Sequence, residues 1–281
     1  MHGVALTSLW VAAWRAAESE RPDALFHDPF ASALAGPEGF AVLDAARAVA
    51  PIEAPAIPVR TRFFDQRIAC GSQVVLLAAG MDARAFRLFW PEATRVYEVD
   101  QAEVLALKQR RLGAAVPSCT RIPVPVDLAD DWPTALEAQA FRPALPTIWL
   151  AEGLLPYLDE SFVRGLLARV SQVSAIGSTL LIDLIGKTML EMPQLRPMLD
   201  FVAKLGAPWR FGTDEPEALL EPLGWQVTAH DLGTFASEVG RWLWPVFPRS
   251  VPGVPRSFLV EATRTARLSS ASSPGRPRPA R

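Results

Sequence analysis

The segment VVLLAAGMDARAFRL, residues 74–88, runs from an apolar stretch into a turn that contains glycine and an acid. The stretch 74–78 has the length and composition of a strand that is covered on both faces of a parallel sheet. In such sheets, ligands bind beyond the carboxyl ends of the strands. The turn from Ala78 to Asp82 is therefore either a cofactor-binding turn or only the end of a buried strand.

Six further apolar runs follow, several of them bounded by turn residues: 95–99, 121–126, 147–151, 179–184, 225–230 and 257–263. Residues 101–112 and 161–173 carry apolar side chains at helical spacing, which fits helices that cross from one parallel strand to the next. The pattern predicts an α/β fold, with a seven-stranded, mostly parallel sheet and helices on both of its faces.

Two regions interrupt this alternation. Residues 1–69 predict a helical cap, with helices over 6–17, 29–34 and 60–69. Residues 186–221 lie between the fifth and sixth strands and are rich in methionine and aromatic residues, which line adaptable pockets but also fill ordinary cores. The insert is therefore a candidate lid, and plain packing is the alternative. We expect one domain over 1–265 and a disordered, Ser/Pro/Arg-rich tail over 266–281.

Composition limits the classes of partner. The 281 residues carry 28 Lys and Arg against 30 Asp and Glu, a formal net charge of −2, so no field attracts nucleic acid or an anionic membrane. Cys70 and Cys119 lie far apart and outside metal-ligand spacing, which argues against a disulfide framework and against a metal site. The N-terminal apolar stretch meets Arg15 and Glu18 before it is long enough to span a bilayer. We expect a cytoplasmic protein that acts on a small molecule, and its oligomeric state is not predicted.

An acid follows each of the first four predicted strands: Asp82, Asp100, Asp127 and Glu152. A dinucleotide site needs a glycine-rich turn whose amides hold pyrophosphate, whereas this turn has a single glycine, Gly80, and then a carboxylate. Asp100 lies 20 residues after Gly80, the spacing of a ribose-binding acid. Ribose without phosphates favours S-adenosylmethionine as the cofactor. A nicotinamide-dependent oxidoreductase is the weaker rival.

Five segments resemble the leucine carboxyl methyltransferase family, in particular its bacterial branch of polyketide-tailoring O-methyltransferases. They are VRTRFFD (59–65), VVLLAAGMDARAFRLFWPEATRVYEVDQAEVLALK (74–108), VDLADDWPTAL (126–136), IWLAEGLLPYLDE (148–160) and PRSFLVEATR (255–264). The resemblance covers roughly residues 5–265, in order. It implies a Rossmann-like class I methyltransferase fold and S-adenosyl-L-methionine as the cofactor.

The resemblance implies four residues at the methionine end of the cofactor. Arg60 would grip the carboxylate, as a guanidinium fork can. Ala78 and Gly80 would line the first turn, and Glu152 would face the amino-acid end. The family pattern LGAG(L/M)D(T/A)R has glycine where this chain has Ala78. Alanine is tolerable there at negative φ and costly at positive φ.

At the adenosine end, the resemblance implies that Asp100 holds the ribose hydroxyls. Asp127 and Leu128 would flank the adenine, with the acid accepting from the exocyclic amine. For Asp100, Asp127 and Glu152, the alternative is an N-cap of the helix after the strand. For Arg60, the alternative is a salt bridge on the helix surface.

The acceptor decides whether the chemistry needs a base. A carboxylate is nucleophilic as it stands, whereas a hydroxyl must lose a proton. His27, in HDPFA, resembles the family's DPFA segment and is the candidate base; Tyr157 can orient an acceptor oxygen, and either residue can instead be structural. We expect O-methylation of a carboxylate or hydroxyl on a small hydrophobic metabolite, free or carrier-bound, in polyketide or other secondary-metabolite biosynthesis. The alternatives are a non-catalytic binding homologue and a protein carboxyl methyltransferase.

Overall fold

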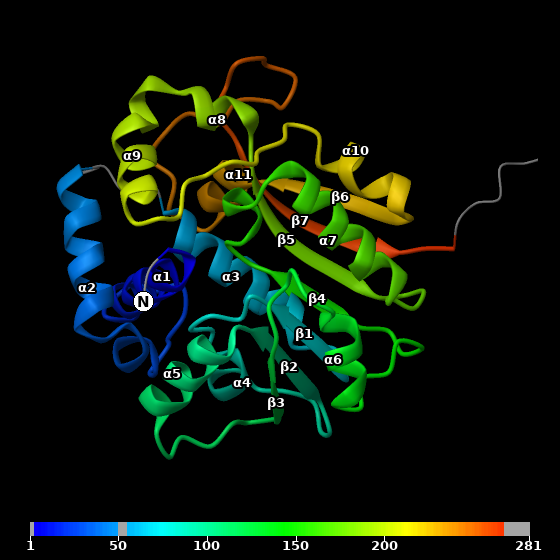
Figure 1. Ribbon diagram of the computed structural model, residues 1–281. Coiled ribbons are helices and arrows are strands. Elements are labelled where there is room, and N and C mark those ends of the chain that lie inside the picture. The colour runs from blue at the N-terminus through cyan, green and yellow to red at the C-terminus, as the bar shows by residue number, and fades with distance from the viewer. Residues whose placement is uncertain (1–2, 50–54, 267–281) are drawn as a thin grey trace, which may run out of the picture.

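The computed structural model describes residues 3–49 and 55–266. The strands in these ranges form one seven-stranded sheet, which is flanked by helices (Figure 1). The strand order is β3-β2-β1-β4-β5-β7-β6. The strands are β1 (Gln73–Leu77), β2 (Arg95–Asp100), β3 (Thr120–Pro125), β4 (Ile148–Ala151), β5 (Thr179–Ile185), β6 (Trp225–Asp231) and β7 (Ser257–Arg264). Each coincides with one of the predicted apolar runs to within two residues, which confirms the predicted α/β fold.

The order in which successive strands are added to the sheet reverses beside β1. Strands β2 and β3 extend the sheet to one side of β1, and β4 and β5 extend it to the other, all in parallel. Val74 accordingly pairs with Val96 on β2 and with Ile148 on β4. Strand β7 lies antiparallel between β5 and β6. The carboxyl ends of the neighbouring strands β1 and β4 therefore mark the topological switch point, where open parallel sheets bind ligands.

Alternate side chains of β1 point to opposite faces, as the pleat requires. Val74 and Leu76 join one buried cluster, and Val75 and Leu77 join the other. The first face is covered by α3 (Ala56–Ile68), α5 (Ala102–Leu112) and α11 (Leu232–Glu238), and the second by α6 (Trp132–Ala138), α7 (Glu160–Gln172) and α10 (Pro216–Leu220). Both faces are covered, which explains why the strands are apolar throughout.

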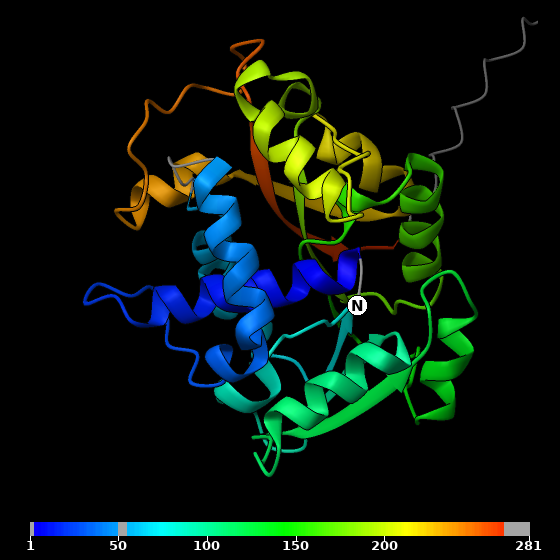
Figure 2. The ribbon, with the colours of Figure 1, turned by 60° about the vertical axis from the view of Figure 1, so that its left-hand side comes forward.

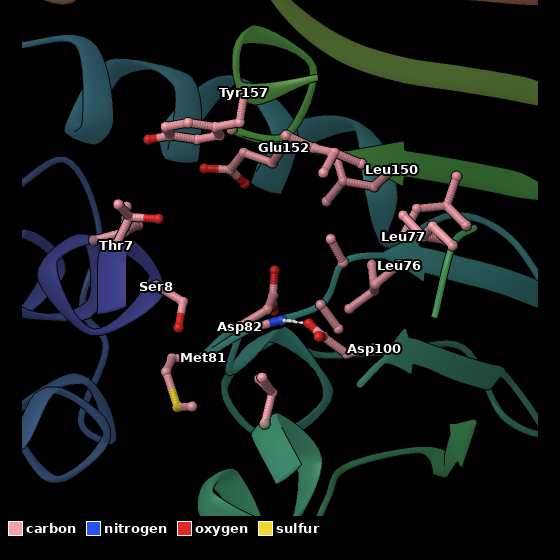
Figure 3. A pocket seen from close by; sticks show the side chains of 18 of the residues that line it. Thr7, Ser8, Leu76, Leu77, Met81, Asp82, Asp100, Leu150, Glu152 and Tyr157 are labelled. Atoms are coloured by element: carbon pink, nitrogen blue, oxygen red, sulfur yellow. Dashed lines mark hydrogen bonds between the residues drawn. The ribbon is translucent and has the colours of Figure 1, made fainter. Parts of the chain in front are cut away.

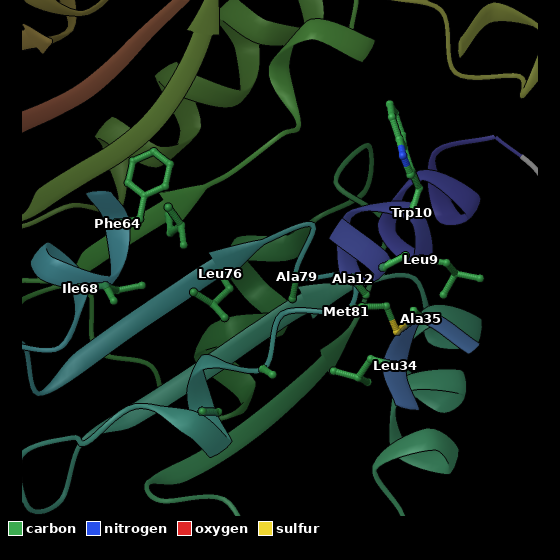
Figure 4. Close-up of a cluster of buried hydrophobic side chains, with 14 of the residues drawn as sticks. Leu9, Trp10, Ala12, Leu34, Ala35, Phe64, Ile68, Leu76, Ala79 and Met81 are labelled. Carbon is green, nitrogen blue, oxygen red and sulfur yellow. The ribbon is translucent and has the colours of Figure 1, made fainter. Parts of the chain in front are cut away.

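The predicted N-terminal cap consists of α1 (Val4–Ser19), α2 (Ala31–Val49) and α3, and α1 crosses α2 (Figure 2). Leu9, Ala12 and Ala35 of the cap belong to the same buried cluster as Leu76 of β1 and Ala79 of the turn after it (Figure 4). The small side chains of Ala12 and Ala35 allow α1 and α2 to approach each other closely.

Helix α2 is much longer than predicted, because the pair Gly36–Pro37 does not end it. Gly36 takes φ 57° and ψ 179°, a kink after which Pro37 starts a second helical run. Proline is tolerated in the first turn of a helix, where its missing N–H has no partner to lose.

The insert between β5 and β6 packs on the cap. It contains α8 (Lys187–Glu191), α9 (Arg196–Lys204) and α10, and α9 contacts α2. Phe201 stands edge-on to Trp10 of α1, with ring centroids 6.1 Å apart. The remaining short elements are α4 (Arg84–Arg87), η1 (Leu155–Tyr157), η2 (Pro193–Leu195) and η3 (Glu221–Leu223).

The predicted disordered tail falls almost wholly on residues 267–281, which lie outside the described residues, as do 50–54 of the linker. No helix in the described ranges combines the length and apolar character that crossing a membrane requires.

Candidate functional site

A cavity of about 240 Å³ lies at the switch point, between the carboxyl ends of the strands and helix α1. Figure 3 shows side chains from α1, from the turns after β1 and β2, and from the end of β4 around it. All seven residues predicted to bind the cofactor line this one cavity: Arg60, Ala78, Gly80, Asp100, Asp127, Leu128 and Glu152. Tyr157 lines it as well. Their individual binding roles stay predictions.

The turn after β1 takes an unusual conformation at Ala78, whose φ is 51°. This is the left-handed region, which favours glycine. Alanine was expected to be tolerable here at negative φ and costly at positive φ, and the φ is positive. Gly80 also has a positive φ, 47°, and a Cβ there would lie 2.9 Å from the Cβ of Ser8 on α1. Glycine at position 80 thus lets the cap approach the turn.

Asp100 ties the turn to the end of β2. Its Oδ2 accepts a hydrogen bond from the Gly80 amide at 2.6 Å, and its Oδ1 accepts one from the Gln101 amide at 2.7 Å. Burial raises the pKa of Asp100 against the opposing effect of these amides. Each carboxylate oxygen accepts about two hydrogen bonds, so Asp100 keeps acceptor capacity for hydroxyls in the cavity.

Asp127 is held locally in a similar way. Its Oδ1 accepts from the Ala129 amide at 2.8 Å, and its Oδ2 accepts from the side chain of Gln101 at 2.7 Å. It is not the N-cap of α6, because that position belongs to Asp131, which accepts from the amide of Thr134. The cavity lining also includes apolar side chains, which suit a flat heterocycle: Val104, Val126, Leu128 and Phe162.

Arg60 of α3 lies between two carboxylates at the opposite end. Its Nε donates to Oε1 of Glu152 at 3.1 Å, and its Nη1 donates to Oδ2 of Asp183 at 3.1 Å. The Gly153 amide donates to the other oxygen of Asp183 at 2.6 Å. The side chain of Arg60 is 13% exposed, so the surface salt bridge that was the alternative does not occur.

Asp183 and the α1 residues Thr7 and Ser8 were not predicted. A lone acid inside the apolar strand TLLIDLI was the available signal for Asp183. Thr7 and Ser8 line the cavity because α1 crosses its mouth, and an amphipathic helix pattern does not tell which sheet edge the helix will cover.

The side chain of Tyr157 lines the same cavity beside Glu152, and its hydroxyl lies near Thr7 (Figure 3). Burial is the largest effect on the pKa of Tyr157 and raises it above the ordinary value of 10.0. The hydroxyl therefore stays protonated at neutral pH, so Tyr157 can orient an oxygen but cannot take its proton.

His27, predicted as the candidate base, is exposed and does not line the cavity. Its neighbour Asp28 turns inward instead, and the fully buried carboxylate accepts from Nε of Arg15 at 2.9 Å. Because adjacent side chains diverge here, the catalytic role expected for His27 is not supported. His230 packs its ring against Phe63, also away from the cavity.

The predicted lid over 186–221 contributes no lining residue to this cavity. Its helix α9 has an apolar face that packs on the cap, with Val202 fully buried. These contacts fit plain packing, and the lid stays a prediction.

The side chains at the cavity fit S-adenosylmethionine in their chemistry. Asp82 and Glu152 offer negative charge to an ammonium group, Arg60 offers a guanidinium to a carboxylate, and Asp100 offers acceptors to ribose hydroxyls. The carboxylate of Asp82 stands where a dinucleotide site would present amides to pyrophosphate, and it would repel a phosphate.

Comparison with known proteins shows which family the chain resembles. The model of the family described as leucine carboxyl methyltransferase matches residues 8–171. A Frankia alni protein, named as a candidate S-adenosyl-L-methionine-dependent methyltransferase, is 41% identical over 281 residues, which cover 94% of this chain and 96% of that protein. A Streptomyces coelicolor protein of the same description is 41% identical over 253 residues, which cover 85% and 89%.

Two crystal structures share the fold at low identity. A candidate methyltransferase from Thermobifida fusca superposes with a TM-score of 0.59 at 18% identity, covering 83% of this chain and 92% of the other. A DUF574 family protein from Streptomyces avermitilis gives 0.56 at 14% identity, covering 88% and 98%. This chain therefore belongs to the leucine carboxyl methyltransferase family, and it is an S-adenosylmethionine-dependent methyltransferase with a Rossmann-like class I fold.

Proposed function

We propose that the protein is an O-methyltransferase whose acceptor is the carboxylate of a small hydrophobic metabolite. The observation that carries this proposal is that the four acids among the described lining residues are engaged within the fold: Asp82 is paired with Arg84, and Asp127 accepts from Gln101. Tyr157 stays protonated because burial raises its pKa. Glu152 is bound by Arg60, and Asp100 by two backbone amides. Since a carboxylate acceptor is already ionised at neutral pH, it needs no base.

The cofactor supplies an electrophilic methyl group on a sulfonium, and the transfer is an in-line displacement. The protein's task is then to align the acceptor and to exclude water. Helix α1 covers the cavity and brings Thr7 and Ser8 to it, with Thr7 beside the hydroxyl of Tyr157 (Figure 3).

The apolar part of the lining supports a hydrophobic acceptor. Val11 of α1 and Leu158 after η1 contribute to it, and no free basic cluster stands among the described lining residues to select a phosphorylated metabolite. We infer a cytoplasmic role in polyketide or other secondary-metabolite biosynthesis, with an acceptor that is free or carrier-bound.

The test uses S-adenosylmethionine labelled with tritium in the methyl group. Purified protein is incubated with a panel of hydrophobic acids, each paired with the alcohol of the same carbon skeleton, and with a peptide that ends in a leucine carboxylate. Methyl esters release the label as volatile methanol in mild alkali, whereas methyl ethers keep it. We expect alkali-labile product from an acid in the panel.

Label in an alkali-stable product would contradict a carboxylate acceptor. Transfer to the leucine peptide would instead identify a protein carboxyl methyltransferase. A protein that binds S-adenosylhomocysteine but transfers no label to any member of the panel would favour the non-catalytic homologue.

A further inference from the structure

Arg84, the first residue of α4, is buried among three carboxylates just behind the cofactor turn. Its side chain is 3% exposed, and its Nε donates to Oδ1 of Asp65 at 2.7 Å. Its Nη1 donates to Asp82, and its Nη2 lies 2.8 Å from Oε2 of Glu152, an ion pair without hydrogen-bond alignment. We propose that Arg84 is a positioning residue, which holds Asp82 and Glu152 in place for the amino-acid end of the cofactor.

The three carboxylates come from separate parts of the fold. Asp65 lies on α3, Asp82 on the turn after β1, and Glu152 directly after β4. Asp82 and Glu152 line the cavity, whereas Arg84 does not, so Arg84 can act on a ligand only through them. A planar guanidinium presents donors in several directions at once, which a lysine ammonium on the same stem cannot match.

The contacts leave Glu152 little freedom. Arg60 binds one of its carboxylate oxygens at 3.1 Å, and Arg84 approaches the other at 2.8 Å. The far side of Arg84 is anchored as well, because Arg87 holds Asp65 with two hydrogen bonds of 2.7 Å. Because both of its carboxylate oxygens are held, Glu152 is preorganised and loses little entropy when a ligand binds.

The charge of Arg84 also keeps Asp82 ionised. Burial acts to raise the pKa of Asp82, but Arg84, with Lys108 and Arg15, outweighs burial and brings that pKa to about 2. Two carboxylates that face one cavity would otherwise repel each other. With Arg84 behind it, Asp82 can present its negative charge to an ammonium group.

The adenosine end of the cavity is held independently. Asp100 receives its hydrogen bonds from Gly80 and Gln101, and Asp127 from Gln101 and Ala129. None of these contacts involves Arg84. Loss of Arg84 should therefore weaken ligands that carry the amino-acid group and spare ligands that lack it.

The experiment compares S-adenosylhomocysteine with 5′-methylthioadenosine, which has the same adenosine and sulfur but no amino-acid group. Binding of both is measured by calorimetry on Arg84→Lys, which keeps the charge, and on Arg84→Gln. We expect both variants to lose at least tenfold in affinity for S-adenosylhomocysteine and to stay within twofold of wild type for 5′-methylthioadenosine.

The matched control is Arg256→Gln. Arg256 is 7% exposed and pairs with Asp231 at 3.0 Å, away from the cavity. It should lower the melting temperature without changing the ratio of the two affinities. An equal loss of both ligands in Arg84→Lys would show a general structural role. Unchanged binding of S-adenosylhomocysteine in that variant would also overturn the proposal.

Discussion

Replacing Ala78 with glycine should make the protein more stable, although the change removes a methyl group and adds flexibility. Ala78 has φ 51° in the turn after β1, and its side chain lines the cavity. A non-glycine residue in the left-handed region is strained, and such strain persists where the surrounding structure imposes it. Here the hydrogen bonds from Ala79 to Val99 and from Gly80 to Asp100 impose it.

The magnitude follows from two opposing effects. Left-handed backbone costs an L-residue roughly 1–2 kcal/mol, which glycine does not incur. Glycine in turn loses about 0.4–1 kcal/mol more than alanine through the entropy of the unfolded chain. The net gain lies between roughly 0 and 1.6 kcal/mol, and its middle value of about 0.8 kcal/mol raises the melting temperature of a domain of this size by about 2–3 °C.

Calorimetric unfolding of Ala78→Gly without ligand is the assay, and two other alanines serve as controls. Ala140→Gly, at an exposed position with φ 61°, should also stabilise the protein. Ala79→Gly should destabilise it, because Ala79 is buried and its φ lies outside the left-handed region. A melting temperature of Ala78→Gly that falls as in Ala79→Gly would refute the reasoning.

Three further predictions follow from the site. Asp100→Ala should weaken S-adenosylhomocysteine by roughly 1–3 kcal/mol in calorimetry, since ribose hydroxyls lose their acceptor; unchanged affinity would make Asp100 only a support of the turn. His27→Ala should keep wild-type turnover and cofactor affinity, because His27 is exposed outside the cavity, and a loss of turnover alone would restore it as a base. Asp82 has a pKa lowered from 3.8 to about 2 in the folded state, so it contributes stability above pH ~4 that is lost as the pH falls through about 2. In urea unfolding, Asp82→Asn should be less stable than wild type by about 2 kcal/mol at pH 7, and this gap should shrink from pH ~4 to ~2; a constant gap would contradict the assignment.

The sheet was predictable because its strands are short apolar runs separated by helices. Burial on both faces makes such runs nearly free of polar residues, and this is visible without any structure. Helix α2 was less predictable, because Gly36 and Pro37 are helix-breaking residues in most contexts. Their effect here depends on contact with Arg111, which donates to the carbonyls of Leu34 and Ala35 from another part of the chain.

In the site, too, local sequence patterns were predictive and long-range contacts were not. The residues that come directly after strands, such as Asp100 and Glu152, could be found because parallel strands bring their carboxyl ends to one edge. Asp183 and Arg84 act within the fold from behind the cavity wall, and long-range packing decides where such side chains point. The position of His27 outside the cavity was unpredictable for a related reason, since the sequence of HDPFA does not tell which of two adjacent side chains turns inward.

The most direct test of the account is a calorimetric titration of the wild-type protein with S-adenosylhomocysteine and, separately, with NAD. The acids beyond β1, β2 and β4, together with Arg60, should bind an adenosyl amino acid and reject pyrophosphate. We predict one S-adenosylhomocysteine bound per chain and no heat of binding with NAD. Binding of NAD, or no binding of S-adenosylhomocysteine, would contradict the account.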